Sequence, residues 1–449
     1  MRRYHRTTFF VSSRWTRQIW ICLALLFSLA VSPGGNSAWA QPRRNPPQPP
    51  KDDLVIDPVT LPPTWKAPPE RLPIVDLDQP IATKEELEKI RKDSLQKYSK
   101  TRIDADLSAQ GKKVIEDSIR YKLAYMTLKD VPGKNPPEPQ VLQLPQLHKR
   151  FIEEVQNVGG GIVRPAAAAA MVDFIGKEVV RQIPPLLKNN FYVRLHAVMI
   201  LGEMDYAPAY ALLLQVIAAP DIHDDPVNGQ PDAIKIAAAS SLIRLLTFAV
   251  PPATVKDRTI IAHTVVDELT KNPKMHWWLQ IRLIEVLRHC DITGVDAGNN
   301  KPFVVDLLVA IIKDTNRLWT VRAKACYVLG RVPLPPTIRP ADVVTTVADF
   351  ALQLSDAAAA KPNNPAWRGC FWDLYLTFRP NNPPKGKDLD AENKLPGGFL
   401  ARIKPEAQPA YDVIVPIVND VLNDKAPAAG SRQALGTFVK GRPAVQPPK

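Results

Sequence analysis

Apolar residues recur every three or four positions in a ten-residue segment that is repeated along the middle of the chain. Residues 193–202 return almost intact as 321–330, and three weaker copies start at Ile234, Leu279 and Trp367. We number each copy from its first residue, which is position 0. In the two full copies, positions 0, 4 and 8 are apolar, which places them on one face of a helix. The copies start 41–46 residues apart, within the period of about 40–47 residues that is typical of stacked helical hairpins. The pattern predicts an all-α repeat structure.

A second helical pattern precedes each copy and supplies the other half of each hairpin. These helices are predicted over 171–187, 207–218, 255–271, 302–313 and 341–354. Before the repeats we expect helices over 83–100, 106–129 and 144–158, the first of them opened by a capping box of Thr83 and Glu86. A last pair is predicted over 409–423 and 431–439. No segment alternates with a period of two, so we expect no β-sheet.

The repeated segment contains small and charged residues with separate expected roles. Ala197 and Ala325, at position 4, allow two helices to approach closely, while Gly202 and Gly330 are expected at helix ends in a left-handed conformation. Position 1 lies among the apolar positions but carries Arg, Lys or Gln. We expect these side chains to bond helix ends or acidic groups of the neighbouring repeat. They are Arg194, Lys235, Arg322 and Arg368, with Gln280 as the exception at this position.

The pattern Val-Arg-x-x-Ala-x-x-x-Leu-Gly resembles the second helix of HEAT repeats. Two copies match it and the others match in part, over about residues 165–440. The resemblance implies an α-solenoid of stacked antiparallel hairpins. It also implies a binding scaffold, because that family contains mostly scaffolds with unrelated ligands. It transfers no catalytic residue.

The two ends of the chain differ in character from the repeats. Residues 1–40 combine five arginines, a 13-residue apolar run and Ala38-Trp39-Ala40, which is typical of a cleaved export signal. Residues 41–80 carry 12 prolines and are expected to form a semi-rigid arm. We therefore predict an exported protein, periplasmic or at the cell surface and not transmembrane after cleavage. Its parts would be this arm, a helical segment 81–160, the repeats 165–440 and a polar tail 441–449.

Charge and cysteine content narrow the possible partners. The net charge of +13 falls to +8 without the signal, which favours acidic partners, but no Lys/Arg run suggests nucleic acid. Three cysteines remain, Cys290, Cys326 and Cys370, and all lie within repeated helices, where we expect them to pack as small apolar residues. The loop 221–232 has the wrong spacing for a calcium motif, and Asp232 is expected to cap the next helix. We expect no metal and no cofactor.

Positions 3, 6 and 10 of the repeated helix lie on the arc opposite its packed face. Together with Arg317 they form a predicted basic groove for a protein partner or another acidic ligand. The candidate binding residues are Arg244, Arg282, His289, Arg317, Lys324, Tyr327 and Arg331. Tyr327 is the expected aromatic anchor. The alternative is that these are ordinary solvated charges.

Two other classes of function stay open. Trp277 and Trp278 could stack on a sugar ring in a carbohydrate or cell-wall binder, or could fill the space between repeats. A helical-repeat, lyase-like enzyme is the other alternative, although phosphate loops, nucleophile elbows and His-Glu-x-x-His helices are all missing. We predict a non-enzymatic scaffold.

Overall fold

The computed structural model describes residues 80–130, 139–158, 165–222, 224–225, 228–296, 300–362, 364–379 and 398–442. Within these ranges every regular element is a helix, and there is no strand. Two isolated β-bridges are present. The all-α prediction is therefore confirmed. The predicted export signal and proline-rich arm, and most of the polar tail, lie outside the described residues. Among the helices described, none combines the length and the apolar character needed to cross a membrane.

The first helices lie close to the predicted positions, although α6 spans Pro165–Gln182 and not the predicted 171–187. They are α2 Lys84–Ile90, α3 Gln96–Ile103, α4 Ala109–Tyr125, α5 Leu144–Gln156 and α6 Pro165–Gln182, with a π-helical turn Arg91–Leu95 between α2 and α3. At the start of α2 the Thr83 hydroxyl accepts a hydrogen bond from the Glu86 amide at 3.1 Å. The Thr83 amide in turn donates to the Glu86 carboxylate at 2.9 Å, which confirms the capping box.

The five repeated segments are all helical, and we call these helices row A. Row A comprises α7 Phe191–Glu203, α9 Asp232–Phe248, α11 Trp277–Cys290, α13 Trp319–Leu329 and α15 Ala366–Phe378. The helices between them form row B, which comprises α8 Tyr210–Ala218, α10 Val255–Lys271, α12 Phe303–Lys313 and α14 Pro340–Ala360. The chain continues into α17 Phe399–Arg402, α18 Lys404–Leu422 and α19 Ala429–Lys440.

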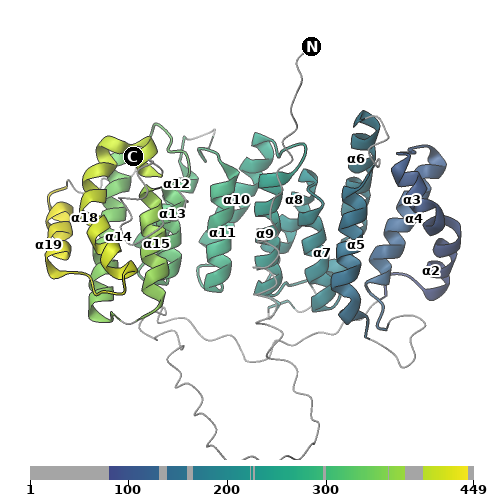
Figure 1. The fold of residues 1–449 in the computed structure, drawn as a ribbon, viewed down its shortest axis with the longest axis horizontal. Helices are drawn as coiled ribbons and strands as arrows, with labels where there is room; N and C mark the ends of the chain where they lie inside the picture. Colours follow the sequence, from purple (N-terminus) through teal and green to yellow (C-terminus); the bar gives the residue numbers. More distant parts are fainter. Residues whose placement is uncertain are drawn as a thin grey trace, which may run out of the picture. The chain divides into compact units, whose positions relative to one another are not determined.

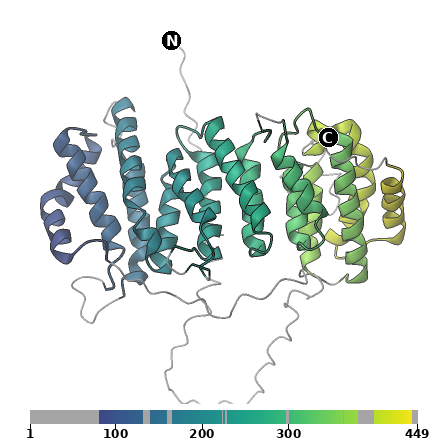
Figure 2. The ribbon, with the colours of Figure 1, turned by 180° about the vertical axis from the view of Figure 1, so that it is seen from behind.

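Helices about forty residues apart in the sequence lie side by side in each row (Figures 1 and 2). Each row A helix contacts the next, from α7 to α15, and α15 contacts α18. In row B, α8 contacts α10, α10 contacts α12, and α12 contacts α14. The rows contact each other through α8 and α9, α10 and α11, and α12 and α13. Every row A helix between the ends therefore packs on two neighbours of its own row as well as on row B.

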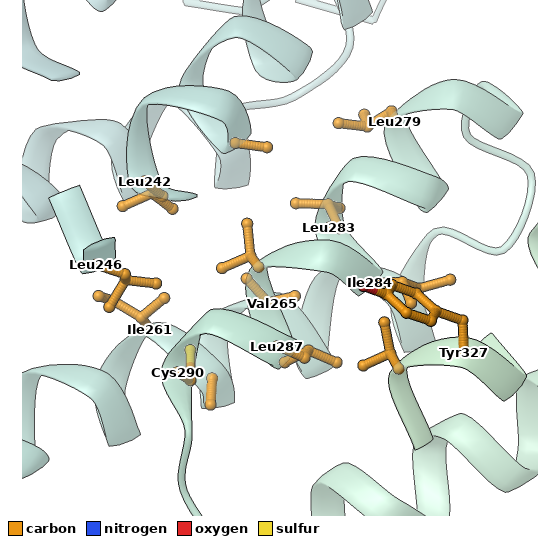
Figure 3. Packing of buried hydrophobic residues seen from close by; sticks show 14 of the residues in the cluster. Leu242, Leu246, Ile261, Val265, Leu279, Leu283, Ile284, Leu287, Cys290 and Tyr327 are labelled. Carbon is orange, nitrogen blue, oxygen red and sulfur yellow. The ribbon is translucent and has the colours of Figure 1, made fainter. Parts of the chain in front are cut away.

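The hydrophobic core runs continuously between the two rows. Val193, Ala197 and Leu201 are at most 1% exposed, and Val321, Ala325 and Leu329 are fully buried, which confirms the predicted packed face. Figure 3 shows the same pattern around α10 and α11, where the side chains of Val265 and Leu283 point toward each other. Burial of this apolar face drives the helices together.

The polar side chains at position 1 of the first four copies are buried in this core and donate to backbone carbonyl groups beyond their own helices, whereas Arg368 of the last copy is exposed. Arg322, 2% exposed, donates from Nε to the Ile312 carbonyl in the last turn of α12 at 2.8 Å. Gln280 donates to the Met275 carbonyl at 2.9 Å, just beyond the end of α10. Lys235 and Arg194 bond the carbonyls of Ala219 and Asn189 in the same way. The predicted role at helix ends is thus confirmed for Arg322, Lys235 and Arg194.

Arg322 has the most complete set of contacts among these residues. Its guanidinium carbon lies 4.6 Å from the Trp319 ring centroid and 5.0 Å from that of Phe350. A terminal nitrogen also donates to the Gln353 side chain of α14 at 2.7 Å. Because cations are attracted to aromatic faces and to the carbonyls at helix C-termini, the charge is stabilised despite its burial.

The expected left-handed conformation of Gly202 and Gly330 is wrong. Gly202 lies inside α7, and Gly330 has a φ of −61°. Both are needed because the next row A helix is too close for a side chain. An added Cβ would lie 2.5 Å from the Ser241 side chain at Gly202 and 2.3 Å from the Thr377 carbonyl oxygen at Gly330. These glycines set the spacing of α7 to α9 and of α13 to α15.

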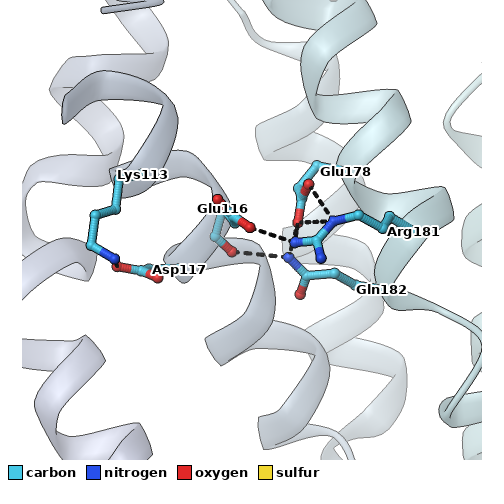
Figure 4. Close-up of polar contacts among 6 residues, drawn as sticks. All are labelled: Lys113, Glu116, Asp117, Glu178, Arg181 and Gln182. Carbon is cyan, nitrogen blue, oxygen red and sulfur yellow. Dashed lines mark hydrogen bonds and ion pairs between the residues drawn. The ribbon is translucent and has the colours of Figure 1, made fainter. Parts of the chain in front are cut away.

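Polar contacts join α4 to α6 (Figure 4). The Gln182 side chain of α6 donates to the Glu116 carbonyl of α4 at 3.1 Å. Arg181 forms an ion pair with Glu178 within α6 and another with Glu116 of α4. Lys113 pairs with Asp117 within α4 at 3.9 Å. The Arg181 side chain is 60% exposed, so these pairs contribute little stability compared with the packed core.

We expect Arg322→Met to lower the free energy of unfolding by about 2–4 kcal/mol, because the Ile312 carbonyl and the Gln353 side chain lose their partner in the core. Arg368 occupies the same position in the last copy, but its side chain is 64% exposed and pairs with Asp424 at 3.5 Å. Arg368→Met should therefore cost about 0.5 kcal/mol or less. Urea denaturation of both variants checks this, and equal effects would contradict the proposed role of buried position 1.

We expect Gly330→Ala to destabilise the protein by about 1–3 kcal/mol, because the new methyl group must push α15 away from α13. Gly430 in α19 is the matched control, since an added Cβ there meets no atom within 4 Å. Gly430→Ala should leave stability unchanged or raise it by up to about 1 kcal/mol. Thermal unfolding of the two variants measures the difference.

Candidate functional site

A groove opens on row A where α11, α13 and α15 lie side by side. It has a volume of about 260 Å³. One wall consists of Trp277, Trp278 and Ile281 from α11, and the other includes Gly369 and Cys370 from α15. Gly369 is exposed, and an added Cβ there meets no atom within 4 Å. The groove is therefore accessible from solvent on the α15 side.

Charged side chains of alternating sign cross the groove from α11 to α15. Arg282 pairs with Glu285 at 2.8 Å, and Lys324 pairs with Asp373 at 2.9 Å and with Glu285 at 3.5 Å. Lys324 and Asp373 are only 16% and 15% exposed. Two cations thus face two carboxylates within one small site. The lining has no net formal charge.

The protonation of this cluster reflects burial and pairing together. Burial lowers the pKa of Lys324, but the carboxylates of Asp373 and Glu285 outweigh it and leave the pKa raised. Burial raises the pKa of Asp373, and Lys324 opposes that rise. The ion pairs therefore keep Lys324 charged in a site where burial alone would disfavour the charge.

Trp278 is the aromatic side chain that lines the groove without being part of the packed core. Its ring stacks on Trp277, with centroids 6.3 Å apart and planes inclined by 20°. Trp277 packs against the hydrophobic core, whereas Trp278 is only half-buried and is not part of that packing. The groove is therefore lined by two stacked indoles, one of which packs against the core.

The start of α11 holds these two rings in place. His276 caps the helix, because its Nδ1 accepts a hydrogen bond from the Trp278 amide at 3.2 Å. The His276 amide donates to the Asp232 carboxylate of α9 at 3.2 Å. The predicted capping role of Asp232 at its own helix is wrong: Pro231 is the N-cap of α9 and makes no side-chain cap bond. Asp232 instead anchors the beginning of the next row A helix.

Of the seven predicted binding residues, the structure brings two into the groove, Arg282 and Lys324. Arg244 pairs with Asp205 at 3.1 Å. His289 lies 3.2 Å from the Thr247 hydroxyl, and burial lowers its pKa. Neither of these two lines the groove.

The remaining three predicted residues make contacts between helices. Arg317 donates to the Gln280 side chain at 2.7 Å and to the Leu269 carbonyl at 3.0 Å. Tyr327 is 5% exposed and accepts a hydrogen bond from Arg288 at 2.5 Å, so it does not present an exposed aromatic face. Arg331 donates to the Leu376 carbonyl at 2.7 Å.

Several residues that line the groove occupy the positions considered in the sequence but are not among the candidate binding residues. Position 3 of three successive copies supplies Arg282, Lys324 and Cys370, and position 6 supplies Glu285 and Asp373. Positions 3 and 6 of the repeated helix thus locate the groove. The prediction of a basic groove, however, does not take into account that its cations are paired with carboxylates. Trp278 and Gly369 lie outside these positions. No periodic signal marks them.

The three cysteines of the described residues, Cys290, Cys326 and Cys370, are buried and form no disulfide bond. Burial raises the pKa of Cys290 to about 12 and also raises the pKa values of Cys326 and Cys370. A thiol with a raised pKa is a poor nucleophile, which supports the predicted packing role. In the part of the chain that the structure describes, no group of three or more His, Cys, Asp or Glu side chains is arranged to hold a metal ion.

A pair of histidines lies between α5 and α7, away from the groove. The Nδ1 atoms of His148 and His196 are 3.0 Å apart, and the Nε2 atom of His148 lies 3.3 Å from the Glu203 carboxylate. Burial and the neighbouring His148 lower the pKa of His196 to about 3. His196 therefore stays neutral in the folded protein at neutral and mildly acidic pH.

Comparison of the chain with protein-family models, curated proteins and solved structures finds no match in any of the three. The likeness to HEAT repeats therefore has no support beyond the repeated sequence motif itself.

We expect the histidine pair to make the protein less stable in mild acid. Because the pKa of His196 is lower in the folded than in the unfolded chain, its contribution is present above about pH 6.5 and is lost as the pH falls toward 3. Between pH 7 and pH 5 this loss should be about 2 kcal/mol of unfolding free energy. In His196→Gln the decrease over that interval should be smaller by this amount.

Urea denaturation at the two pH values measures the difference. The control is His263→Gln, since the side chain of His263 is 45% exposed. An unchanged pH dependence in His196→Gln would contradict the assignment.

Proposed function

We propose that the protein is a non-catalytic binding scaffold, an α-solenoid that holds its ligand in the groove of α11, α13 and α15. The proposal rests on the groove itself, which combines indole rings with two ion pairs whose cations, Arg282 and Lys324, occupy position 3 of successive repeats. Small-molecule and recognition sites combine aromatic walls with a few placed polar groups in this way. The continuous rows of helices support the solenoid, because each row A helix rests on neighbours of the same kind.

The surroundings in which the scaffold works are inferred from the sequence alone. The export signal 1–40 and the proline-rich arm 41–80 support a periplasmic or cell-surface protein held at a distance from its attachment point. A partner protein or a cell-wall polymer would then be the available ligands. The lyase-like alternative gains no support from the groove, whose ionisable groups are paired with one another.

The ion pairs weaken the case for an acidic partner. Arg282 and Lys324 were expected to attract negative charge, but each lies next to a carboxylate of the groove. An anionic ligand would have to displace those carboxylates or lie beside them. Electrostatic attraction by the net charge of the chain remains long-ranged and steers encounter more than it determines affinity.

The test fills the groove without disturbing the fold. We expect Gly369→Leu to reduce retention of the physiological partner at least tenfold, because the new side chain projects into open space in the groove. Stability should rise slightly, since glycine within a helix is unfavourable. The assay is affinity capture from the cell-envelope extract with the full chain, compared with Gly430→Leu, which adds the same side chain to open space on α19.

Retention that is lost in Gly369→Leu and kept in Gly430→Leu supports binding in the groove. Equal retention by both variants would show that the partner binds elsewhere and would contradict the proposal.

A further inference from the structure

We infer that the ligand is a neutral glycan. One of its sugar rings stacks on Trp278, and its hydroxyl groups bond the charged side chains of the groove. These are Arg282, Glu285, Lys324 and Asp373. The inference rests on the proposed function, because it takes the groove to be the binding site. It adds the chemical class of the ligand.

The aromatic wall fits the face of a sugar ring. An indole presents a flat, electron-rich face that attracts the weakly positive C–H groups on one side of a pyranose. Trp278 stacks on the core-packed Trp277, and the His276 side chain accepts a hydrogen bond from its amide. A ring that is fixed before binding loses little conformational freedom when the ligand arrives.

The polar wall fits a ligand that both donates and accepts hydrogen bonds. Arg282 and Lys324 are donors only, whereas Glu285 and Asp373 accept when ionised. A sugar hydroxyl bridges such a pair, because its proton bonds the carboxylate while its oxygen accepts from the cation. The Thr320 hydroxyl on α13 adds a group of either kind.

The charge balance distinguishes a neutral glycan from charged ligands. A carboxylate or phosphate placed near Arg282 or Lys324 also lies near Glu285 or Asp373. In the same way, a cation placed near one of these carboxylates also lies near Arg282 or Lys324. Like charges in a partly buried site repel strongly. A neutral ligand avoids this repulsion and still makes charge-assisted hydrogen bonds.

The size of the groove fits one ring at a time. Sites for drug-sized ligands measure about 300–1,000 Å³, and the groove has about 260 Å³. Because the groove opens to solvent beside Gly369, neighbouring sugars of a longer chain can extend along the surface of α15. This geometry suits a polymer better than a free monosaccharide.

The test is calorimetric titration of the full chain with neutral hexasaccharides of glucose, mannose, xylose and N-acetylglucosamine. Polygalacturonate and a poly-glutamate peptide serve as anionic probes. We expect at least one neutral hexasaccharide to bind, with less than twofold change in Kd between 0.05 and 0.5 M salt, because screening does not affect an uncharged ligand.

Variants assign this binding to the stacking ring. Trp278→Ala should raise the Kd at least tenfold, and Trp278→Phe, which keeps an aromatic face, should raise it about threefold or less. The matched control is Phe248→Ala, which removes an aromatic side chain that is 56% exposed on α9, outside the groove, and should leave the Kd unchanged. Thermal unfolding of each variant confirms that it is folded.

Three outcomes overturn the inference: no neutral hexasaccharide binds, binding survives Trp278→Ala, or only the anionic probes bind. Comparison with the groove-filling variant separates the two proposals. If Gly369→Leu loses a captured partner while no neutral glycan binds, the groove is a binding site for another ligand. If Gly369→Leu retains every captured partner and no glycan binds, both proposals fail.

Discussion

The arrangement of the helices depends on how the carbonyl groups near the ends of the row B helices find partners inside the core. A helix leaves its last carbonyls without intrahelical donors, and burial without a partner costs free energy. Arg322 and Lys235 each donate to a carbonyl at the end of the preceding helix, and Gln280 does so just beyond it. Because the donor lies one residue after the first apolar position of the row A helix, this bond fixes the register of the two helices within one hairpin.

This register decides which side chains of row A remain available to a ligand. With position 1 directed into the core, positions 3 and 6 lie on the open side of α11 and α15, where Arg282 and Asp373 line the groove. The close approach of α13 to α15 at Gly330 brings Lys324 within 2.9 Å of Asp373. The groove is thus a consequence of the same contacts that hold neighbouring helices together.

The sequence predicted the parts of the fold that depend on local periodicity. Val255–Lys271 is helical over the predicted residues, and Arg322 at position 1 has its predicted role, because both follow from spacing within one helix. Apart from the N-cap of α9, which is Pro231 and not Asp232, the failures concern contacts between repeats. Gly330 is required by the Thr377 carbonyl of the next helix, and Tyr327 is covered by neighbours. The pairing of Lys324 with Asp373 joins residues 49 apart, and a motif ten residues long contains no information on it.

The departure of the last copy from the repeat pattern is what opens the groove. Position 2 carries Leu195, Ile236 and Ile281 in the first three copies and Ala323 in the fourth, but Gly369 in the last. An added Cβ at Gly369 meets no atom, so close packing does not require glycine there, although glycine weakens a helix by about 0.5–1 kcal/mol. Residues that break a local rule without a packing reason tend to mark functional sites. At Gly369 the lost helix stability leaves open space on the α15 side of the groove, and under the proposed function this is the space that the ligand occupies.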